Sequence, residues 1–168
     1  MTAGNVPPSR PDWLTAIRRY LLVVTAANLM WETAQAPLYT LWRMATPLEI
    51  VQAIVHCTLG DLVIATAALI AALALVGSPA WPDRRAGALI ATVVIGTTGY
   101  TIYSEYVNVV VKQSWAYTEW MPRLPWLGTG LSPLAQWLIV PAVALFWAGR
   151  AVSARDQRLP QKSPRSAI

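Results

Sequence analysis

The sequence predicts an all-α integral membrane protein, a four-helix bundle whose helices each cross the bilayer. The first observation is composition: only 12% of the 168 residues are charged and 55% are hydrophobic, whereas soluble domains carry about 25% charged residues. The second is that the apolar residues gather in four long runs. Each run is close to, or longer than, the roughly 20 residues with which a helix crosses the hydrocarbon core.

The four predicted helices cover residues 14–36, 48–76, 86–111 and 132–149. The second run opens with Thr46 and Glu49, at the spacing of a capping box in which each side chain accepts a backbone N–H of the other residue. The fourth opens with Ser132 and Pro133, residue types that favour the N-cap and the first helical position. These signals place the starts of both helices.

A cleaved signal peptide is the alternative interpretation of the first run. Arg18 and Arg19, the apolar stretch after them and the small residues within 34–36 resemble the parts of such a peptide. However, Glu32 lies close to the cleavage point that this interpretation requires, and Pro37 would follow the cut directly. A retained helix is therefore the prediction.

Positive charges predict the orientation. Of the 13 Lys and Arg residues, ten stand at the start of the first run, between the second and third, or after the fourth, while Arg43, Lys112 and Arg123 fall on the other side. The positive-inside rule then places both termini in the cytoplasm (N-in, C-in) of an inner (plasma) membrane. The net charge of +5 is explained by this orientation, without a nucleic-acid partner. Residues 1–12 and 151–168 are predicted to be disordered.

The remaining composition excludes several kinds of site. The chain has one cysteine and one histidine, which excludes an internal disulfide, a CxxC motif and a haem held by two histidines of one chain. No metal and no cofactor are predicted. The loop at 114–126, between the third and fourth runs, carries three tryptophans and a tyrosine. Such residues prefer the membrane interface, so this aromatic-rich loop is predicted to lie at the outer surface.

Four acids fall within the predicted helices, and two of them, Glu32 and Asp61, are predicted to lie inside the membrane. Glu32 is thirteen residues beyond Arg19, which places it about 20 Å along the first helix at 1.5 Å per residue. Asp61 is twelve residues beyond Glu49, about 18 Å into the second helix and near the middle of the bilayer. A carboxylate there costs about 2.5–3.5 kcal/mol on insertion scales. Each acid is therefore expected to have a partner, to be protonated or to serve a site.

Most other polar residues in the runs are predicted to lie in the outer half of the membrane. The candidate binding residues are Trp31, Glu32, Gln52, His56, Asp61, Glu105, Asn108, Trp115 and Gln136. The alternative for each acid is a hydrogen bond to a neighbouring helix without further function. His56 is more readily a packing residue than a metal ligand, because Cys57 beside it points about 100° away on a helix.

Two further patterns concern pairs of residues. Glu119 and Arg123 have the i,i+4 spacing of a surface ion pair. The segments 46–52 and 132–136 both read Thr or Ser, Pro, Leu and then Gln. This echo is either shared helix-start chemistry or an internal duplication, and a duplication would predict that Glu32 and Glu105 face each other.

The spacing of Trp31-Glu32, Gly60-Asp61, Glu105, Trp115-Ala116-Tyr117, Met121-Pro122 and 130–137 resembles a group of small bacterial inner-membrane proteins of uncharacterised function. The resemblance covers about residues 13–149 and implies no activity. A looser similarity, of architecture alone, is to four-helix membrane proteins of the sterol-isomerase and sigma-2 receptor type.

Two classes of function are compatible with these residues. In the first, the protein is a binding, transport or accessory membrane subunit whose acids hold a proton, a cation or a partner helix. In the second, it is an intramembrane enzyme with isomerase-like or cyclase-like acid–base chemistry on a lipid-like substrate. The sequence has no nucleophile motif, metal cluster or phosphate loop, which favours the first class. The expected partners are membrane lipids, and beyond them a lipid-like small molecule or another membrane protein.

Overall fold

The computed structural model describes residues 13–77, 81 and 85–156. These residues form helices joined by loops. The four long helices are α1 (Trp13–Gln35), α3 (Pro47–Val76), α4 (Ala86–Glu105) and α5 (Leu131–Asp156). The shorter elements are the 3₁₀-helix η1 (Ala36–Leu38), α2 (Leu41–Met44) and the π-helix η2 (Tyr106–Val111). The predicted disordered segment 1–12 lies outside the described residues, and α5 runs to Asp156, into the segment for which a tail is predicted.

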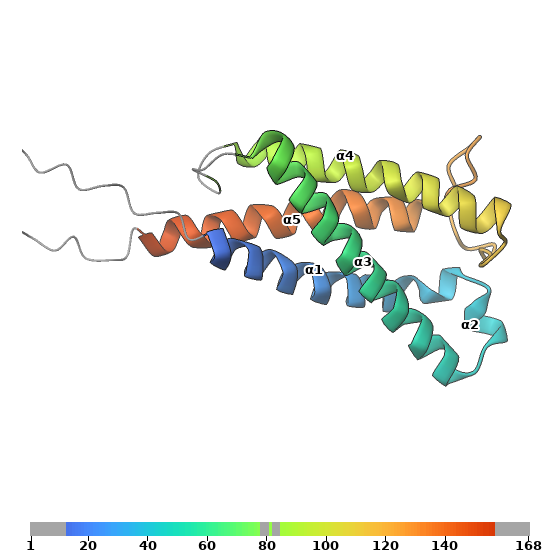
Figure 1. The fold of residues 1–168 in the computed structure, drawn as a ribbon. Helices are drawn as coiled ribbons and strands as arrows, with labels where there is room; N and C mark the ends of the chain where they lie inside the picture. Colours follow the sequence, from blue (N-terminus) through green and yellow to red (C-terminus); the bar gives the residue numbers. More distant parts are fainter. Residues whose placement is uncertain (1–12, 78–80, 82–84, 157–168) are drawn as a thin grey trace, which may run out of the picture.

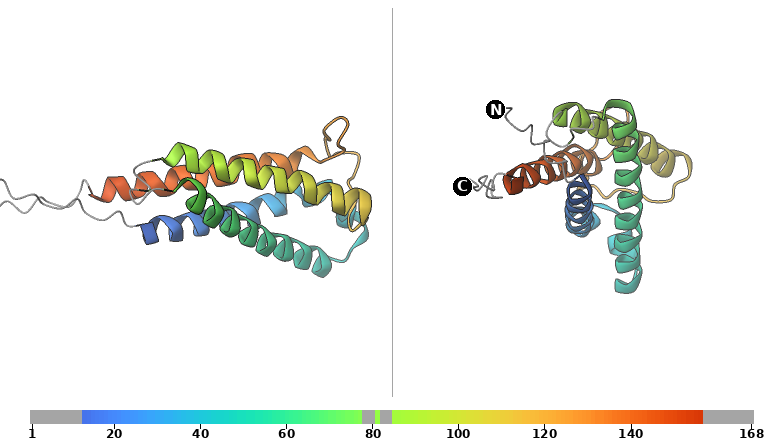
Figure 2. Two further views of the ribbon diagram at one scale, coloured as in Figure 1. Left: turned by 45° about the horizontal axis from the view of Figure 1, so that its top comes forward. Right: turned by 60° about the vertical axis from the view of Figure 1, so that its left-hand side comes forward.

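The long helices pack as a bundle. Helix α5 lies between α1 and α4 and packs against both, while α3 crosses the bundle diagonally and also packs against α1 and α4 (Figures 1 and 2). The buried core between them consists of Tyr20, Val24, Ala65, Leu69, Ala72, Leu89, Val93, Val140, Ala144 and Ala148. Several of these residues are alanines, which let helix backbones approach closely in a membrane.

Three helices are long and apolar enough to cross a membrane: Pro47–Val76, Ala86–Val111 and Leu131–Arg150. They indicate a multi-pass membrane protein. Side chains such as Leu22, Val63 and Ile95 are exposed on the outside of the bundle, as expected of surfaces that face lipid. Helix α1 is not among the three, because Arg18, Arg19 and other polar residues interrupt its apolar run. The fourth crossing and the N-in, C-in orientation therefore stay predictions.

Local sequence signals predict the start of α3 correctly and the start of α5 incorrectly. The capping box is confirmed: the backbone N–H of Thr46 donates to Oε2 of Glu49 at 2.8 Å, and the backbone N–H of Glu49 donates to Oγ1 of Thr46 at 3.4 Å. The predicted N-cap role of Ser132 is wrong, because α5 already begins at Leu131. The third predicted helix is divided, since its last turns form the π-helix η2.

The first half of α3 diverges from the bundle. Figure 1 shows this end of the helix leading away from α1 toward α2. Every residue from Pro47 to Cys57 is exposed or half-buried, and the first buried side chain is that of Thr58. Only the second half of α3 therefore contributes to the core.

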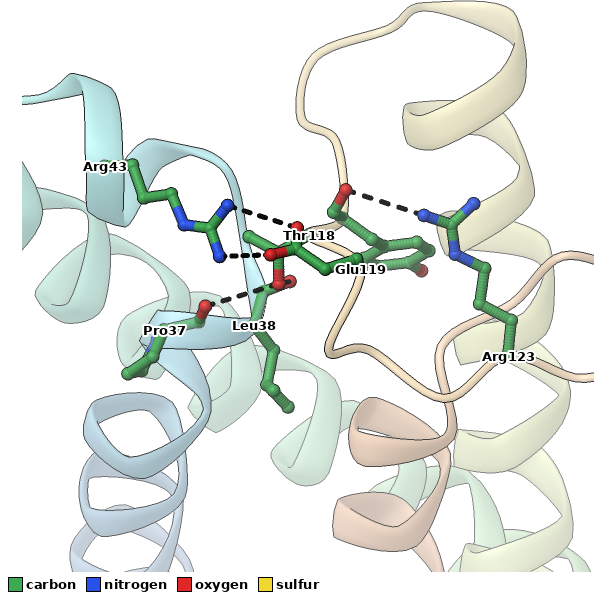
Figure 3. A network of polar contacts seen from close by, with 7 residues as sticks. Pro37, Leu38, Arg43, Thr118, Glu119 and Arg123 are labelled. Atoms are coloured by element: carbon green, nitrogen blue, oxygen red, sulfur yellow. Dashed lines mark hydrogen bonds and ion pairs between the residues drawn. The ribbon is translucent and has the colours of Figure 1, made fainter.

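The end of the bundle that carries η1, α2 and residues 112–130, here called the loop end, is held by the chain itself. The backbone N–H of Thr40 donates to the carbonyl of Ala116, and that of Thr118 donates to the carbonyl of Leu38, both at 2.9 Å. The Thr118 hydroxyl also donates to the carbonyl of Pro37 (Figure 3). These bonds tie two segments that lie about 80 residues apart in sequence.

The charged residues of the loop end pair differently from the sequence prediction. The two carboxylate oxygens of Glu119 accept hydrogen bonds from the guanidinium of Arg43 at 2.6 and 3.1 Å (Figure 3). The predicted pair of Glu119 with Arg123 is wrong, because this part of the loop is not helical and the i,i+4 spacing does not apply. Arg123 lies instead over the ring of Tyr117, 5.1 Å from its centre.

The core assignment predicts unequal effects for two neighbouring residues of α3. Leu69 is 2% exposed and Ile70 is 63% exposed. We expect Leu69→Ala to lower the free energy of unfolding by about 2–5 kcal/mol, because it leaves a cavity. The matched control, Ile70→Ala, removes a similar volume from the outside of the bundle and should have a small effect. Unfolding in detergent measures both, and equal losses would contradict this packing.

The Arg43–Glu119 pair predicts a pH-dependent contribution to stability. Hydrogen bonds from Arg43 lower the pKa of the Glu119 carboxyl below its ordinary value. The stabilisation is therefore present above the ordinary glutamate pKa and is lost as the pH falls through the lowered one. We expect Arg43→Gln to reduce the melting temperature slightly at neutral pH and low salt, and not in acid or high salt. Arg123→Gln is the control, since a pH-dependent loss there would contradict the assignment.

Candidate functional site

Polar side chains from α1, α3 and α5 meet inside the bundle. Asn28, Glu32 and Gln35 follow each other at i, i+4 and i+7, so they share one face of α1. Asp61 of α3 and Gln136 of α5 complete the group. We call these five residues the carboxyl cluster. All are buried except Glu32, which is half-buried.

The side-chain amide of Gln136 is the centre of the carboxyl cluster. Its Nε2 lies 3.0 Å from Oδ2 of Asp61, 3.0 Å from Oε1 of Glu32 and 3.2 Å from Oδ1 of Asn28. The Nε2 of Gln35 donates to Oε1 of Glu32 at 2.8 Å and to Oε1 of Gln136 at 3.2 Å. A primary amide has two N–H groups. The three acceptors around Gln136 therefore compete for two hydrogens.

Glu32 and Asp61 are also near enough to each other to interact electrostatically. An ionised carboxylate has only acceptors, so two neighbouring carboxyls around one amide are short of donors unless one of them carries a proton. Within the described residues, the ion pair between Arg43 and Glu119 is the only one. A buried charge without a partner is costly. The arrangement therefore suits a pair of carboxyls that carries one proton.

Glu105 stands beside the cluster in a separate setting. It is buried at the junction of α4 and η2, and the hydroxyl of Tyr117 donates to its Oε2. The same Tyr117 oxygen accepts the backbone N–H of Gly130 at 3.1 Å. A Cβ at position 130 would lie only 2.9 Å from the sulfur of Met121, so glycine allows this close approach. Glu105 is near enough to interact electrostatically with Glu32, but no hydrogen bond joins them.

Tyr39 lies near both Glu105 and the carboxyl cluster. Its ring centre lies 5.5 Å from that of Tyr117. Burial raises the pKa of the Tyr39 phenol well above its ordinary value, and the neighbouring charges of Glu105 and Glu32 raise it further. The phenol therefore stays protonated and can donate a hydrogen bond, but it cannot serve as a base near neutral pH.

The other predicted site residues do not join the carboxyl cluster and lie in three different places. Gln52 and His56 are exposed on the diverging half of α3, away from the carboxyl cluster. Asn108 donates from its Nδ2 to the carbonyl of Ser104 at 2.9 Å, within its own stretch of helix. The indole of Trp115 lies beside Glu105. In the part of the chain that the structure describes, no group of three or more His, Cys, Asp or Glu side chains could hold a metal ion.

Trp31 and Ser132 join α1 to α5 at the edge of the cluster. The indole N–H of Trp31 donates to Oγ of Ser132 at 3.2 Å, and the Ser132 hydroxyl donates to Oε1 of Gln35 at 2.8 Å. Sequence reasoning missed Asn28, Gln35 and Ser132 as members of the site. The spacing of Asn28, Glu32 and Gln35 was the available signal, since it places three polar side chains on one helix face.

Comparison with known proteins identifies no relative: no protein-family model, curated protein or solved structure matches the chain. The resemblance to small bacterial inner-membrane proteins therefore stays a prediction. The site is interpreted from its own geometry.

The geometry predicts that one glutamine stabilises the fold and another does not. Gln136→Leu keeps most of the volume but leaves Asp61 and Glu32 without their shared amide donor. We expect it to lower the free energy of unfolding by about 3 kcal/mol, because hydrogen bonds to charged groups and buried unpaired groups are each worth about 1–3 kcal/mol. Gln52→Leu, on the exposed half of α3, is the control and should have little effect. Equal unfolding curves for wild type and Gln136→Leu would show that the amide does not hold the acids.

Proposed function

We propose that the protein is a multi-pass membrane subunit of the binding, transport or accessory class, in which the Glu32–Asp61 pair binds and releases one proton. One observation carries the proposal: two carboxyl groups from different helices each lie 3.0 Å from the same amide nitrogen, and among the described residues no basic side chain is paired to either. Within lipid, an ionisable residue of this kind is a functional hypothesis by default.

The surroundings favour a proton site that opens toward one end. On the loop-end side, Glu32 is half-buried and Glu105 and Tyr39 lie close to it. Toward the other end, the buried residues after Asp61 are Ala65, Leu69 and Ala72 on α3 and Ala144 and Ala148 on α5. These apolar side chains relay no protons, and the buried hydroxyls of Tyr20 and Thr97 already donate to backbone carbonyls. A proton would therefore enter and leave from the loop end, as in a binding site rather than a channel.

The second candidate is an intramembrane acid–base enzyme. Glu105 favours it, because this acid accepts a phenol hydrogen bond while the nearby Glu32 shares amide donors with another acid. Two neighbouring carboxyls in unlike environments can take the roles of general acid and base. The binding role is preferred because two neighbouring acids that share one amide donor account for a bound proton without any substrate.

Infrared difference spectroscopy of the full chain in lipid nanodiscs tests the proton site. The wild type should show the carbonyl stretch of a protonated carboxyl, shifted in D₂O. Asp61→Asn and Glu32→Gln should each lose the same part of this band, because the new amide supplies the missing donor. Glu49→Gln, an exposed acid at the start of α3, should retain it. An unchanged band in both cluster variants would overturn the proposal.

A further inference from the structure

The end of the bundle opposite the loop end carries unneutralised positive charge. The start of α1, the start of α4 and the last turns of α5 meet there (Figure 1), and we call it the arginine end. Its described arginines are Arg18, Arg19, Arg85 and Arg150. The acids whose side chains the structure describes lie in the carboxyl cluster, beside it or near the loop end: Glu32, Glu49, Asp61, Glu105 and Glu119. None of these acids can pair with the arginine end.

The guanidinium of Arg19 lies against α5. Its Cζ is 5.8 Å from the centre of a Trp147 ring, within the roughly 6 Å of a cation–π contact. Nη1 is enclosed and has no hydrogen-bond partner among the described residues. The side chain as a whole is only half-buried. Because no described residue accepts from Nε or Nη2 and neither is enclosed without a partner, both remain open to a ligand. The ring covers one face of the guanidinium and leaves its in-plane N–H donors for an anion.

The aromatic side chains beside Arg19 face outward. Trp147 is 50% exposed and Phe146 is 54% exposed. The Cζ of Arg150 lies 4.5 Å from the centre of the Phe146 ring. Arg150 follows Trp147 at i+3, so it stands one turn further along the same side of α5. Two guanidinium groups thus stack on two adjacent rings that are open on the outside of the bundle.

The depth of these residues matches the head groups of one leaflet. The apolar span of α5 runs from Leu131 to Arg150, 20 residues, or about 30 Å at 1.5 Å per residue. The hydrocarbon core is also about 30 Å thick. Arg150 therefore stands where the hydrocarbon ends and the lipid phosphates begin. Trp147 lies one turn inside this level, and the long side chain of Arg19 can extend from there toward the head groups.

We propose that Arg19, Trp147 and Arg150 bind the phosphate of one anionic phospholipid. Guanidinium donors match the geometry of phosphate oxygens, and the exposed rings cover the apolar part of the lipid next to its head group. A zwitterionic head group adds a cation that the surrounding arginines repel, so a lipid without that cation is preferred. This site lies at the opposite end of the described helices from the loop end, and it does not depend on proton binding by Glu32 and Asp61.

Native mass spectrometry of the full chain tests the site. The protein in detergent is titrated with phosphatidylglycerol or with phosphatidylcholine of the same chains. We expect the wild type to retain phosphatidylglycerol in preference. Arg19→Gln should weaken this binding about tenfold, as expected for lost hydrogen bonds to a charged group. Arg18→Gln is the matched control, because it removes the same charge from the neighbouring position. Arg18 is exposed and lies over no described aromatic ring, so its loss should have little effect.

Two further measurements distinguish the lipid site from general attraction of charges. Arg19→Lys keeps the charge without the planar donors and should bind phosphatidylglycerol more weakly than the wild type. Inorganic phosphate at millimolar concentration should not displace the lipid, because it makes no contact with the rings. Equal binding by Arg19→Gln and Arg18→Gln, or equal retention of both lipids by the wild type, would overturn the proposal. Displacement by inorganic phosphate would overturn the assignment to a lipid. Unfolding curves in detergent establish that each variant is folded.

Discussion

The side-chain amide of Gln136 sets the arrangement of the bundle at the level of the carboxyl cluster. Lipid is as apolar as leucine, so hydrophobic burial does little to choose how membrane helices rotate against each other. A polar contact does choose, because a misaligned helix would leave acids without donors. Gln136 contacts Glu32 on α1 and Asp61 on α3 at the same distance. The register of three helices is thereby tied to one side chain, and Gln35 and Ser132 take their positions from it.

The two ends of the bundle are stabilised by different forces. On the side of Asp61 that faces away from the loop end, the helices pack closely through small and branched side chains. The Tyr20 hydroxyl donates there to the Ala65 carbonyl. On the side of Asp61 that faces the loop end, α3 diverges from the bundle. The loop segments there are held together by backbone hydrogen bonds and by the Arg43–Glu119 pair. Those bonds are local to the loop end and do not need α3. The site therefore lies at the boundary between a tightly packed half and a more open one.

The approximate positions of the long helices could be predicted from the sequence, because they depend on neighbours in the chain. The apolar runs and the Thr46–Glu49 capping box are of this kind. Contacts between helices could not, since they depend on crossing angles. Counting residues predicts that Asp61 lies deeper than Glu32, yet both lie 3.0 Å from the same nitrogen of Gln136, because α3 runs diagonally and each residue advances less along the bundle (Figure 1). The same diagonal course carries Gln52 and His56 away from the site that they were expected to join.

The hydrogen bonds of Gln35 join the carboxyl cluster to the contact between α1 and α5 at Trp31 and Ser132. Its Nε2 donates to Glu32, and its Oε1 accepts from Ser132. A group that donates to Oε1 polarises the amide and strengthens its N–H as a donor. A stronger donor at Glu32 favours the charged carboxylate over the protonated form. The hydrogen bond from Ser132 therefore favours release of the proton that we propose for the Glu32–Asp61 pair, and reciprocity of linkage requires that proton release strengthen the Ser132–Gln35 bond by the same factor.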